Sequence, residues 1–143
     1  MGSAKVALVR AVLDTNVVIS ALVFEGKSSA LAPAWKHRQF TLLVSQALVT
    51  EYVRVLHYPK FRLTRQDIRY LLEEELLPFL TPVRVTRTPQ VIRADPSDDH
   101  VLACAVSGKA DLIVSGDHHL LDLKRYRKIP IVPLAHFIDQ LGL

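Results

Sequence analysis

Short, mainly apolar runs alternate with helical patterns along this chain, and this alternation constrains the fold more than any other feature. Runs without polar alternation are typical of parallel strands that are covered on both faces. They occupy residues 11–14, 41–45, 82–85, 111–115 and 129–133. This order predicts an α/β fold with three layers, in which right-handed crossovers place helices on both faces of a central parallel sheet of about five strands.

Helical patterns separate the strands, and polar residues mark several of the helix starts. Ser and Thr are favoured there because their side-chain oxygens accept hydrogen bonds from the first free amides. The predicted helices cover 16–24, Ser28 or Ser29 to Trp35, Ser45 to Leu56, Thr64 to about 79, Ser97 or Asp98 to Gly108, and about 134–142. No repeat or Gly/Ser linker interrupts the pattern, so we expect residues 1–143 to form a single domain.

The composition is that of a globular protein, since half of the residues are hydrophobic and 22% are charged. The apolar runs are too short to span a membrane and no secretory cleavage site is clear, so we expect a cytoplasmic protein without membrane association. The one cysteine, Cys104, cannot form an intrachain disulfide and is expected to be a small buried side chain. The net charge of +4 suits a polyanionic partner, although many basic proteins bind no nucleic acid.

Acidic residues stand where an α/β sheet usually forms its site. Asp14 ends the first predicted strand, Asp117 follows the fourth, and Asp98 opens a helix. Glu51 lies at the margin of the apolar stripe of the helix that begins at Ser45. Taken singly, each has a simpler explanation as a helix cap, a turn residue or a solvated helix residue. Together they predict a convergence of carboxylates at the carboxyl edge of the sheet, where strand order reverses.

Converging carboxylates repel one another, and a bound divalent cation removes that repulsion. Oxygen ligands favour Mg²⁺ or Mn²⁺, which complete their coordination with water and substrate phosphate. Such a cation polarises a phosphoryl oxygen and lowers the pKa of a bound water, which suits hydrolysis of a phosphodiester bond.

Three segments resemble, in order, the motifs of the PIN-domain family. They are LDTNVVISAL at 13–22, SQALVTEYVRVLHYPKF at 45–61 and DPSDDHVLACAVSGKADLIVSGDHHLL at 95–121. The resemblance extends from about residue 11 to residue 138 and is closest to the bacterial and archaeal branch described as toxin components of toxin–antitoxin pairs. It implies a Mg²⁺- or Mn²⁺-dependent endoribonuclease acting on single-stranded RNA, with a cognate antitoxin as a possible protein partner.

The resemblance also implies roles for individual residues. It makes Asp14, Glu51, Asp98 and Asp117 the catalytic and metal-binding acids, with Asn16 and Ser115 in supporting positions beside them.

The segment DPSDD offers three candidates for the third acid. We expect Asp98 to be the ligand, because apolar residues at i+3, i+4 and i+7 from it form the inward stripe of its helix. Asp99 is turned about 100° from Asp98 and is expected to support the site. Asp95 precedes a proline, which favours extended backbone outside the helix.

A homodimer is expected for two reasons. Family members are often dimeric, and the helical stretches Leu22 to Trp35 and Leu48 to Leu56 offer more apolar surface than one short sheet can cover.

Two other functions stay open at this point. The chain could be a catalytically silent PIN-like module that binds RNA or protein, or a phosphatase with an aspartate nucleophile. The phosphatase usually needs a second Asp where Asn16 stands. His118 and His119 could contact phosphate or transfer protons, although exposed turn histidines are commoner. The basic run at 124–128 could follow an RNA backbone or be a solvated loop.

Overall fold

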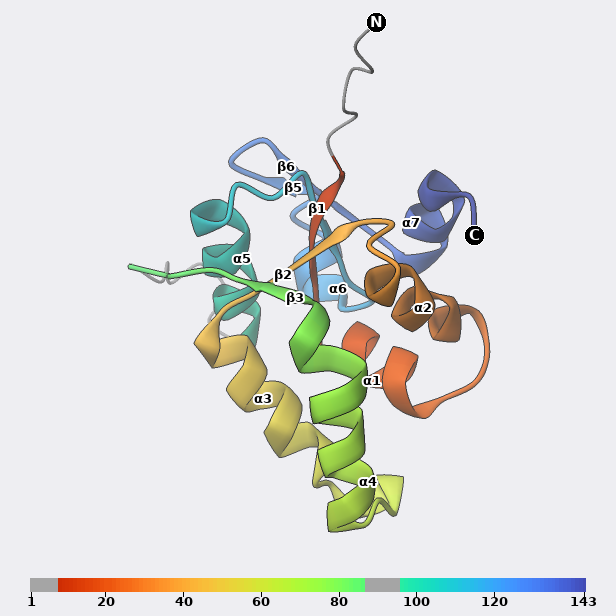
Figure 1. Cartoon of the computed structure of the whole chain (residues 1–143). Helices are drawn as coiled ribbons and strands as arrows, with labels where there is room; N and C mark the ends of the chain where they lie inside the picture. Colours follow the sequence, from red (N-terminus) through yellow and green to blue (C-terminus); the bar gives the residue numbers. More distant parts are fainter. Residues whose placement is uncertain (1–7, 87–95) are drawn as a thin grey trace, which may run out of the picture.

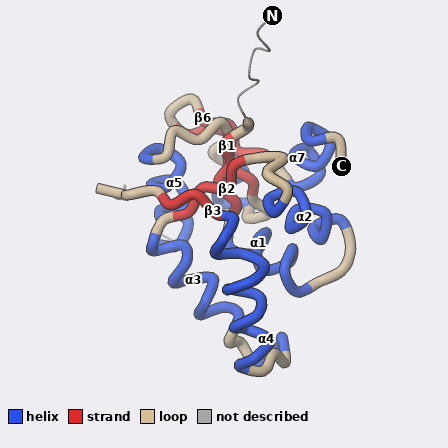
Figure 2. Tube along the Cα trace, in the orientation of Figure 1, coloured by secondary structure: helices blue, strands red, loops and turns tan. Residues whose placement is uncertain are grey.

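A computed structural model of the chain describes residues 8–86 and 96–143, with only the backbone at 96 and 97. Within these residues, a sheet of six strands has the order β3-β2-β1-β4-β6-β5 (Figures 1 and 2). Five strands are parallel, and β5 pairs antiparallel with β6. The strands are β1 (Arg10–Leu13), β2 (Thr41–Val44), β3 (Leu80–Pro82), β4 (Leu112–Val114), β5 (Arg125–Tyr126) and β6 (Ile129–Val132).

Helices cover both faces of the sheet. The α-helices are α1 (Thr15–Val23), α2 (Leu31–Lys36), α3 (Gln46–Leu56), α4 (Arg65–Tyr70), α5 (Pro96–Ser107), α6 (His118–Leu121) and α7 (Leu134–Leu141). Shorter helical turns are η1 (Lys27–Ala30), η2 (Pro59–Phe61), η3 (Leu71–Leu76) and η4 (Leu77–Phe79). Helix α5 packs against β1, β2 and β4, whereas α1 packs against α2 and α3. The strand order reverses between β1 and β4, which confirms the predicted α/β architecture and places a switch point there.

The third predicted strand, at 82–85, was placed wrongly along the chain. The observed β3 begins at Leu80, and Leu80 and Pro82 pair with Leu42 and Val44 of β2. Pairing cannot continue to Val85 because β2 ends at Val44, where the chain turns into α3. A proline is tolerated in β3 because it is an edge strand.

The basic run at 124–128 forms the first strand and the turn of a β-hairpin, where a loop was one expectation, and its four Lys and Arg residues are exposed to solvent as that expectation holds. Tyr126 pairs with Ile129, so Arg127 and Lys128 form a two-residue turn. Both have positive φ, 46° and 69°, as a type I′ turn requires. This turn precedes β6, which runs parallel to β4. The turn therefore lies at the amino edge of the sheet, opposite the carboxyl ends of β1 and β4 (Figure 1).

The helix starts agree with the prediction at two places and differ at two. Ser45 caps α3 and Thr64 caps α4, each accepting a hydrogen bond from a backbone amide. The second predicted helix instead begins with η1 after Gly26, whose φ of 121° is one that glycine adopts readily. The fifth begins at Pro96, ahead of Ser97, since proline is well suited to a first helical position.

The core lies between the sheet and its helices. Trp35 and Tyr52 are fully buried and are among the largest side chains of the core. Cys104 is also buried, and burial raises the pKa of its thiol to about 12, so it does not supply a thiolate nucleophile near neutral pH.

Among the described residues, no single helix is long and apolar enough to cross a membrane. Together, the segments Thr15–Val23 and Lys27–Lys36 would be long and apolar enough, but the two helices meet at a bend of 88°.

Candidate functional site

Ser115 connects the two acids that follow the central strands. The amide of Asp14 donates to the Val114 carbonyl at 2.9 Å, which joins the end of β1 to β4. The Ser115 hydroxyl donates to Asp14 Oδ2 at 2.8 Å and accepts from the Asp117 amide at 2.9 Å. Since Ser115 is fully buried, it holds Asp14 in position and fixes the backbone from which Asp117 projects.

Asp14, Asp98 and Asp117 form an acid cluster at the carboxyl edge of the sheet. Each offers a carboxylate oxygen, and the three oxygens lie within 4.8 Å of one another. Asp98 reaches the cluster from the first turn of α5, the helix that crosses from β3 to β4. Only 6% of Asp14 and 2% of Asp98 is exposed, so water screens their charges poorly.

The electrostatics of the acid cluster favour a bound cation. Burial raises the pKa of Asp14 above its ordinary value, and the charges of Asp117 and Glu51 raise it further. Hydrogen bonds from Ser115 and from the Thr15 amide only partly oppose this. The Thr15 hydroxyl is buried and has no hydrogen-bond partner among the described residues. A set of oxygen donors with surplus negative charge fits a hard divalent cation.

Three of the other predicted site residues lie outside the acid cluster. Glu51 projects from α3 and forms an ion pair of 3.7 Å with Arg54, and 15% of its side chain is exposed. Its charge nevertheless raises the pKa of Asp14. Asp99 is buried but does not belong to the cluster, and Asn16 is exposed on the first turn of α1. Asp95 lies outside the described residues.

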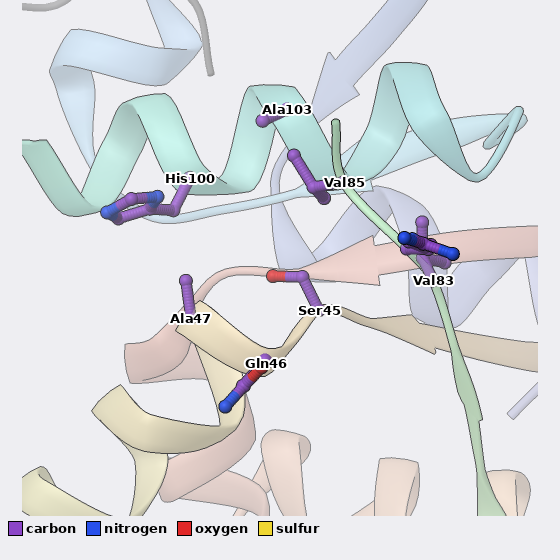
Figure 3. Close-up of a pocket in the computed structure, with 8 residues that line it drawn as sticks. Ser45, Gln46, Ala47, Val83, Val85, His100 and Ala103 are labelled. Atoms are coloured by element: carbon purple, nitrogen blue, oxygen red, sulfur yellow. The ribbon is translucent and has the colours of Figure 1, made fainter. Parts of the chain in front are cut away.

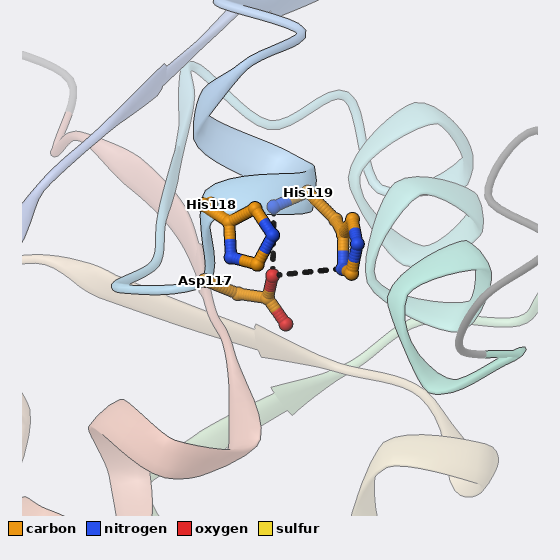
Figure 4. A group of neighbouring side chains, drawn as sticks. All are labelled: Asp117, His118 and His119. Atoms are coloured by element: carbon orange, nitrogen blue, oxygen red, sulfur yellow. Dashed lines mark hydrogen bonds and ion pairs between the residues drawn. The ribbon is translucent and has the colours of Figure 1, made fainter.

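Two features of the site go beyond the sequence prediction. The Tyr52 hydroxyl donates to the Leu13 carbonyl at 3.3 Å and so supports the end of β1 directly before Asp14. Burial, together with nearby groups, raises the pKa of Tyr52 well above its ordinary value, so this hydroxyl stays protonated. The second feature is the proximity of His118 and His119 to the Asp117 carboxylate (Figure 4).

A cavity of about 410 Å³ lies between the start of α3, the segment after β3, and α5. Gln46 and Ala47 of α3 and Ser45, which caps this helix, line one side of it, and His100 and Ala103 line it from α5 (Figure 3). Arg84, which is exposed, contributes a cation to its wall. The two helices that line this cavity are those that carry Glu51 and Asp98.

Comparisons with known proteins agree with the observed fold. Residues 10–119 match the family model described as PIN domain. Among solved structures, a chain from the crystal structure of FitAcB from Neisseria gonorrhoeae is similar, with a TM-score of 0.54 and 16% sequence identity. The match covers 88% of this chain and 99% of that chain. Among curated proteins, none matches the sequence.

Proposed function

This chain belongs to the PIN-domain family, and on that premise we propose that it is a divalent-metal-dependent endoribonuclease that hydrolyses single-stranded RNA. The observation that carries the proposal is the acid cluster. Three carboxylates from two strand ends and a helix start meet within 4.8 Å at the switch point of the sheet. Structural carboxylates rarely converge in this way without a positive partner.

Asp14, Asp98 and Asp117 would bind Mg²⁺ or Mn²⁺ directly. Glu51 would contribute through a bound water, because Mg²⁺ usually keeps part of its water shell. When bound, the cation supplies charge stabilisation at the phosphoryl group and makes a bound water more acidic. Ser115 positions Asp14, and we infer that the exposed Asn16 amide contacts the substrate or a water of the metal shell.

Two observations favour RNA as the substrate class. The net charge of +4 favours a polyanion despite the acids at the site. The 410 Å³ cavity adjoins helices α3 and α5, and Arg84, His100 and Gln46 offer it polar groups that can contact phosphate or a base edge. The basic hairpin lies at the other edge of the sheet, so we assign it no part in holding RNA at the acid cluster.

The first test is cleavage of a fluorescently labelled single-stranded RNA by the purified chain. We expect cleavage with Mn²⁺ or Mg²⁺ and none after EDTA, because the carboxylates alone cannot activate water for attack on a phosphodiester. Asp14→Asn serves as the control for contaminating nuclease and should be inactive. Cleavage that persists in EDTA contradicts the mechanism. Divalent-dependent RNA binding without any cleavage would instead favour the silent binding module.

We also propose that the chain is the toxin component of a toxin–antitoxin pair in the cytoplasm, as the resemblance of its motifs suggests. A small adjacent gene that encodes a DNA-binding domain followed by an acidic or amphipathic tail would support this. Inhibition of RNA cleavage by the product of that gene would test it directly.

The reason first given for a homodimer is weaker in the structure, because α2 and α3 bury most of their apolar residues in the core. An apolar patch lies elsewhere, formed by the exposed Phe24 and Tyr70 and the half-buried Phe61 and Leu63. The rings of Phe24 and Phe61 lie 5.7 Å apart, and Leu63 and Tyr70 line a neighbouring hollow beside the end of α1. Phe24 and Tyr70 are 51% and 55% exposed.

We expect a homodimer that buries this apolar patch. Light scattering at micromolar concentration should give about twice the 16.1 kDa of one chain. Phe24→Ser should weaken the association at least about tenfold, since burying one large apolar side chain contributes about 1.5–3 kcal/mol. Leu143→Ser, at an exposed apolar residue of the C-terminus, is the matched control. A monomer across the concentration range would contradict the expectation.

A further inference from the structure

His118 and His119 form a histidine pair that lies against the carboxylate of Asp117. One nitrogen from each ring and one carboxylate oxygen lie within 4.8 Å of one another (Figure 4). Asp117 Oδ1 is 3.4 Å from His119 Nδ1. The two ring centroids are 4.1 Å apart and the ring planes are inclined by 37°. Three potential ligand atoms of two chemical kinds therefore face one small volume.

The backbone of this turn holds the three side chains in place. Asp117 precedes α6, and its Oδ1 accepts a hydrogen bond of 2.8 Å from the His119 amide, which fixes the carboxylate beside both rings. Leu120 anchors the turn because its side chain is fully buried. The rings themselves are exposed, with 43% of the His119 side chain accessible. A metal ion can therefore reach them without any rearrangement of the core.

Asp117 belongs to the acid cluster, and its carboxylate also lies beside the histidine pair. In nucleases that use two metal ions, the ions lie about 3.5–4 Å apart and share a substrate oxygen. One carboxylate with two oxygens is suited to link two such positions. The donors on its two sides differ, however. The acid cluster offers oxygen alone, whereas the histidine pair adds imidazole nitrogen, which transition-metal ions accept and Mg²⁺ disfavours.

We propose that Asp117, His118 and His119 form a second divalent-cation site, selective for first-row transition-metal ions such as Mn²⁺, Co²⁺ and Zn²⁺. Its suggested place in a two-metal centre rests on the proposed nuclease function, whereas binding of the ion rests on the three side chains alone. Neutral imidazole supplies the lone pair, and water completes the coordination of this exposed ion. The site would make the chain respond differently to Mg²⁺ and to transition-metal ions.

The test is the NMR spectrum of the histidine ring nitrogens of the whole ¹⁵N-labelled chain, titrated with Zn²⁺ or with Mg²⁺. Zn²⁺ binds nitrogen ligands more tightly than Mn²⁺ and is diamagnetic. With the first equivalents of Zn²⁺, we expect the ring-nitrogen signals of His118 and His119 to move to the chemical shifts of metal-bound imidazole. Mg²⁺ should not move them to these shifts. The signal of His136, exposed on α7, is the internal control. Signals of His118 and His119 that respond no more than that of His136 would overturn the proposal.

Four variants separate this site from the acid cluster and from an exposed histidine elsewhere. His118→Gln and His119→Gln should each weaken Zn²⁺ binding at least about 10–100-fold, the cost of losing even an outer partner of a metal ligand, and His136→Gln should not. Both rings are exposed, so folding is not at risk. Asp14→Asn should leave the ring shifts in place. If His118→Gln and His119→Gln bind Zn²⁺ as tightly as His136→Gln, the site does not exist.

The outcome is independent of RNA cleavage. If the ring nitrogens bind Zn²⁺ but the chain cuts no RNA, the result supports the metal site and contradicts the proposed nuclease function. Cleavage with Mg²⁺ in a chain whose rings bind no Zn²⁺ would support the nuclease and refute the second site.

Discussion

Asp98→Asn is expected to lower kcat/KM for RNA by at least about 100-fold and to weaken Mn²⁺ binding by a similar factor, since a lost ligand costs at least as much as a lost outer partner. Asp98 is one of the three residues whose oxygens meet in the acid cluster. Asp99→Asn should lose less activity and less Mn²⁺ affinity, because Asp99 is buried next to Asp98 in the chain but lies outside the cluster. The comparison isolates position, since both residues lie in the first turn of α5.

The measurements are initial rates of RNA cleavage in Mn²⁺ and calorimetric titration with Mn²⁺. Asp139→Asn, at an exposed carboxylate on α7, is the matched control and should behave as the unchanged chain. Thermal unfolding of each variant should show an intact fold, because Asn replaces Asp with nearly the same shape. An inactive Asp99→Asn together with an active Asp98→Asn would show that the ligand is assigned to the wrong residue.

The fold could be predicted from the sequence because its signals are local. The runs at 41–45 and 111–115 have three consecutive apolar residues at their centres, and β2 and β4 lie within them with these residues buried. The hairpin was missed because its turn carries Arg127 and Lys128, not the Asn-Gly pair that usually signals a type I′ turn. The edge strand β3 was displaced because its pairing is set by the length of β2, which the sequence around 82–85 does not show.

The candidate site likewise combines features that local sequence patterns predict with features that they do not. The positions of Asp14 and Asp117 after strands, and of Asp98 at a helix start, follow from local pattern. The contacts that organise them do not. Ser115 meets Asp14 across 101 residues of sequence, and Tyr52 meets Leu13 across 39. Whether Glu51 enters the cluster depends on side-chain geometry, and the structure pairs it with Arg54 instead. The motif resemblance could indicate these residues but not their distances.

Asp14→Asn is expected to stabilise the metal-free protein at pH 7 and to abolish its stabilisation by Mn²⁺. Burial and the neighbouring charges raise the pKa of Asp14 in the folded chain above its ordinary value of 3.8. The folded state therefore retains the proton more strongly than the unfolded state, so ionisation of Asp14 destabilises the fold as the pH rises. Asn carries no charge and its side-chain oxygen can still accept the hydrogen bond from Ser115.

Because folding raises the pKa of Asp14, the difference in stability between the two proteins should depend on pH in a defined way. Below pH 3.8 the acid is protonated in both states, and the difference in stability between Asp14→Asn and the unchanged chain should be small. The difference should grow as the pH rises through the raised pKa of the folded state and stay constant above it. Taking the difference between the two proteins removes the titration of carboxylates that lie far from Asp14. Thermal unfolding in EDTA from pH 3 to pH 8 measures it.

Addition of Mn²⁺ should reverse the order of stability. At about 100 times its dissociation constant, a ligand that binds only the folded state stabilises it by about 2.7 kcal/mol. For a chain of this size that corresponds to a rise in Tm of roughly 5–10 °C. The unchanged chain should show this rise at pH 7, and Asp14→Asn should show much less at the same Mn²⁺ concentration. Equal rises in both proteins would mean that Asp14 does not bind the ion. An unchanged chain that is more stable than Asp14→Asn in EDTA would mean that its carboxylate is already compensated within the protein.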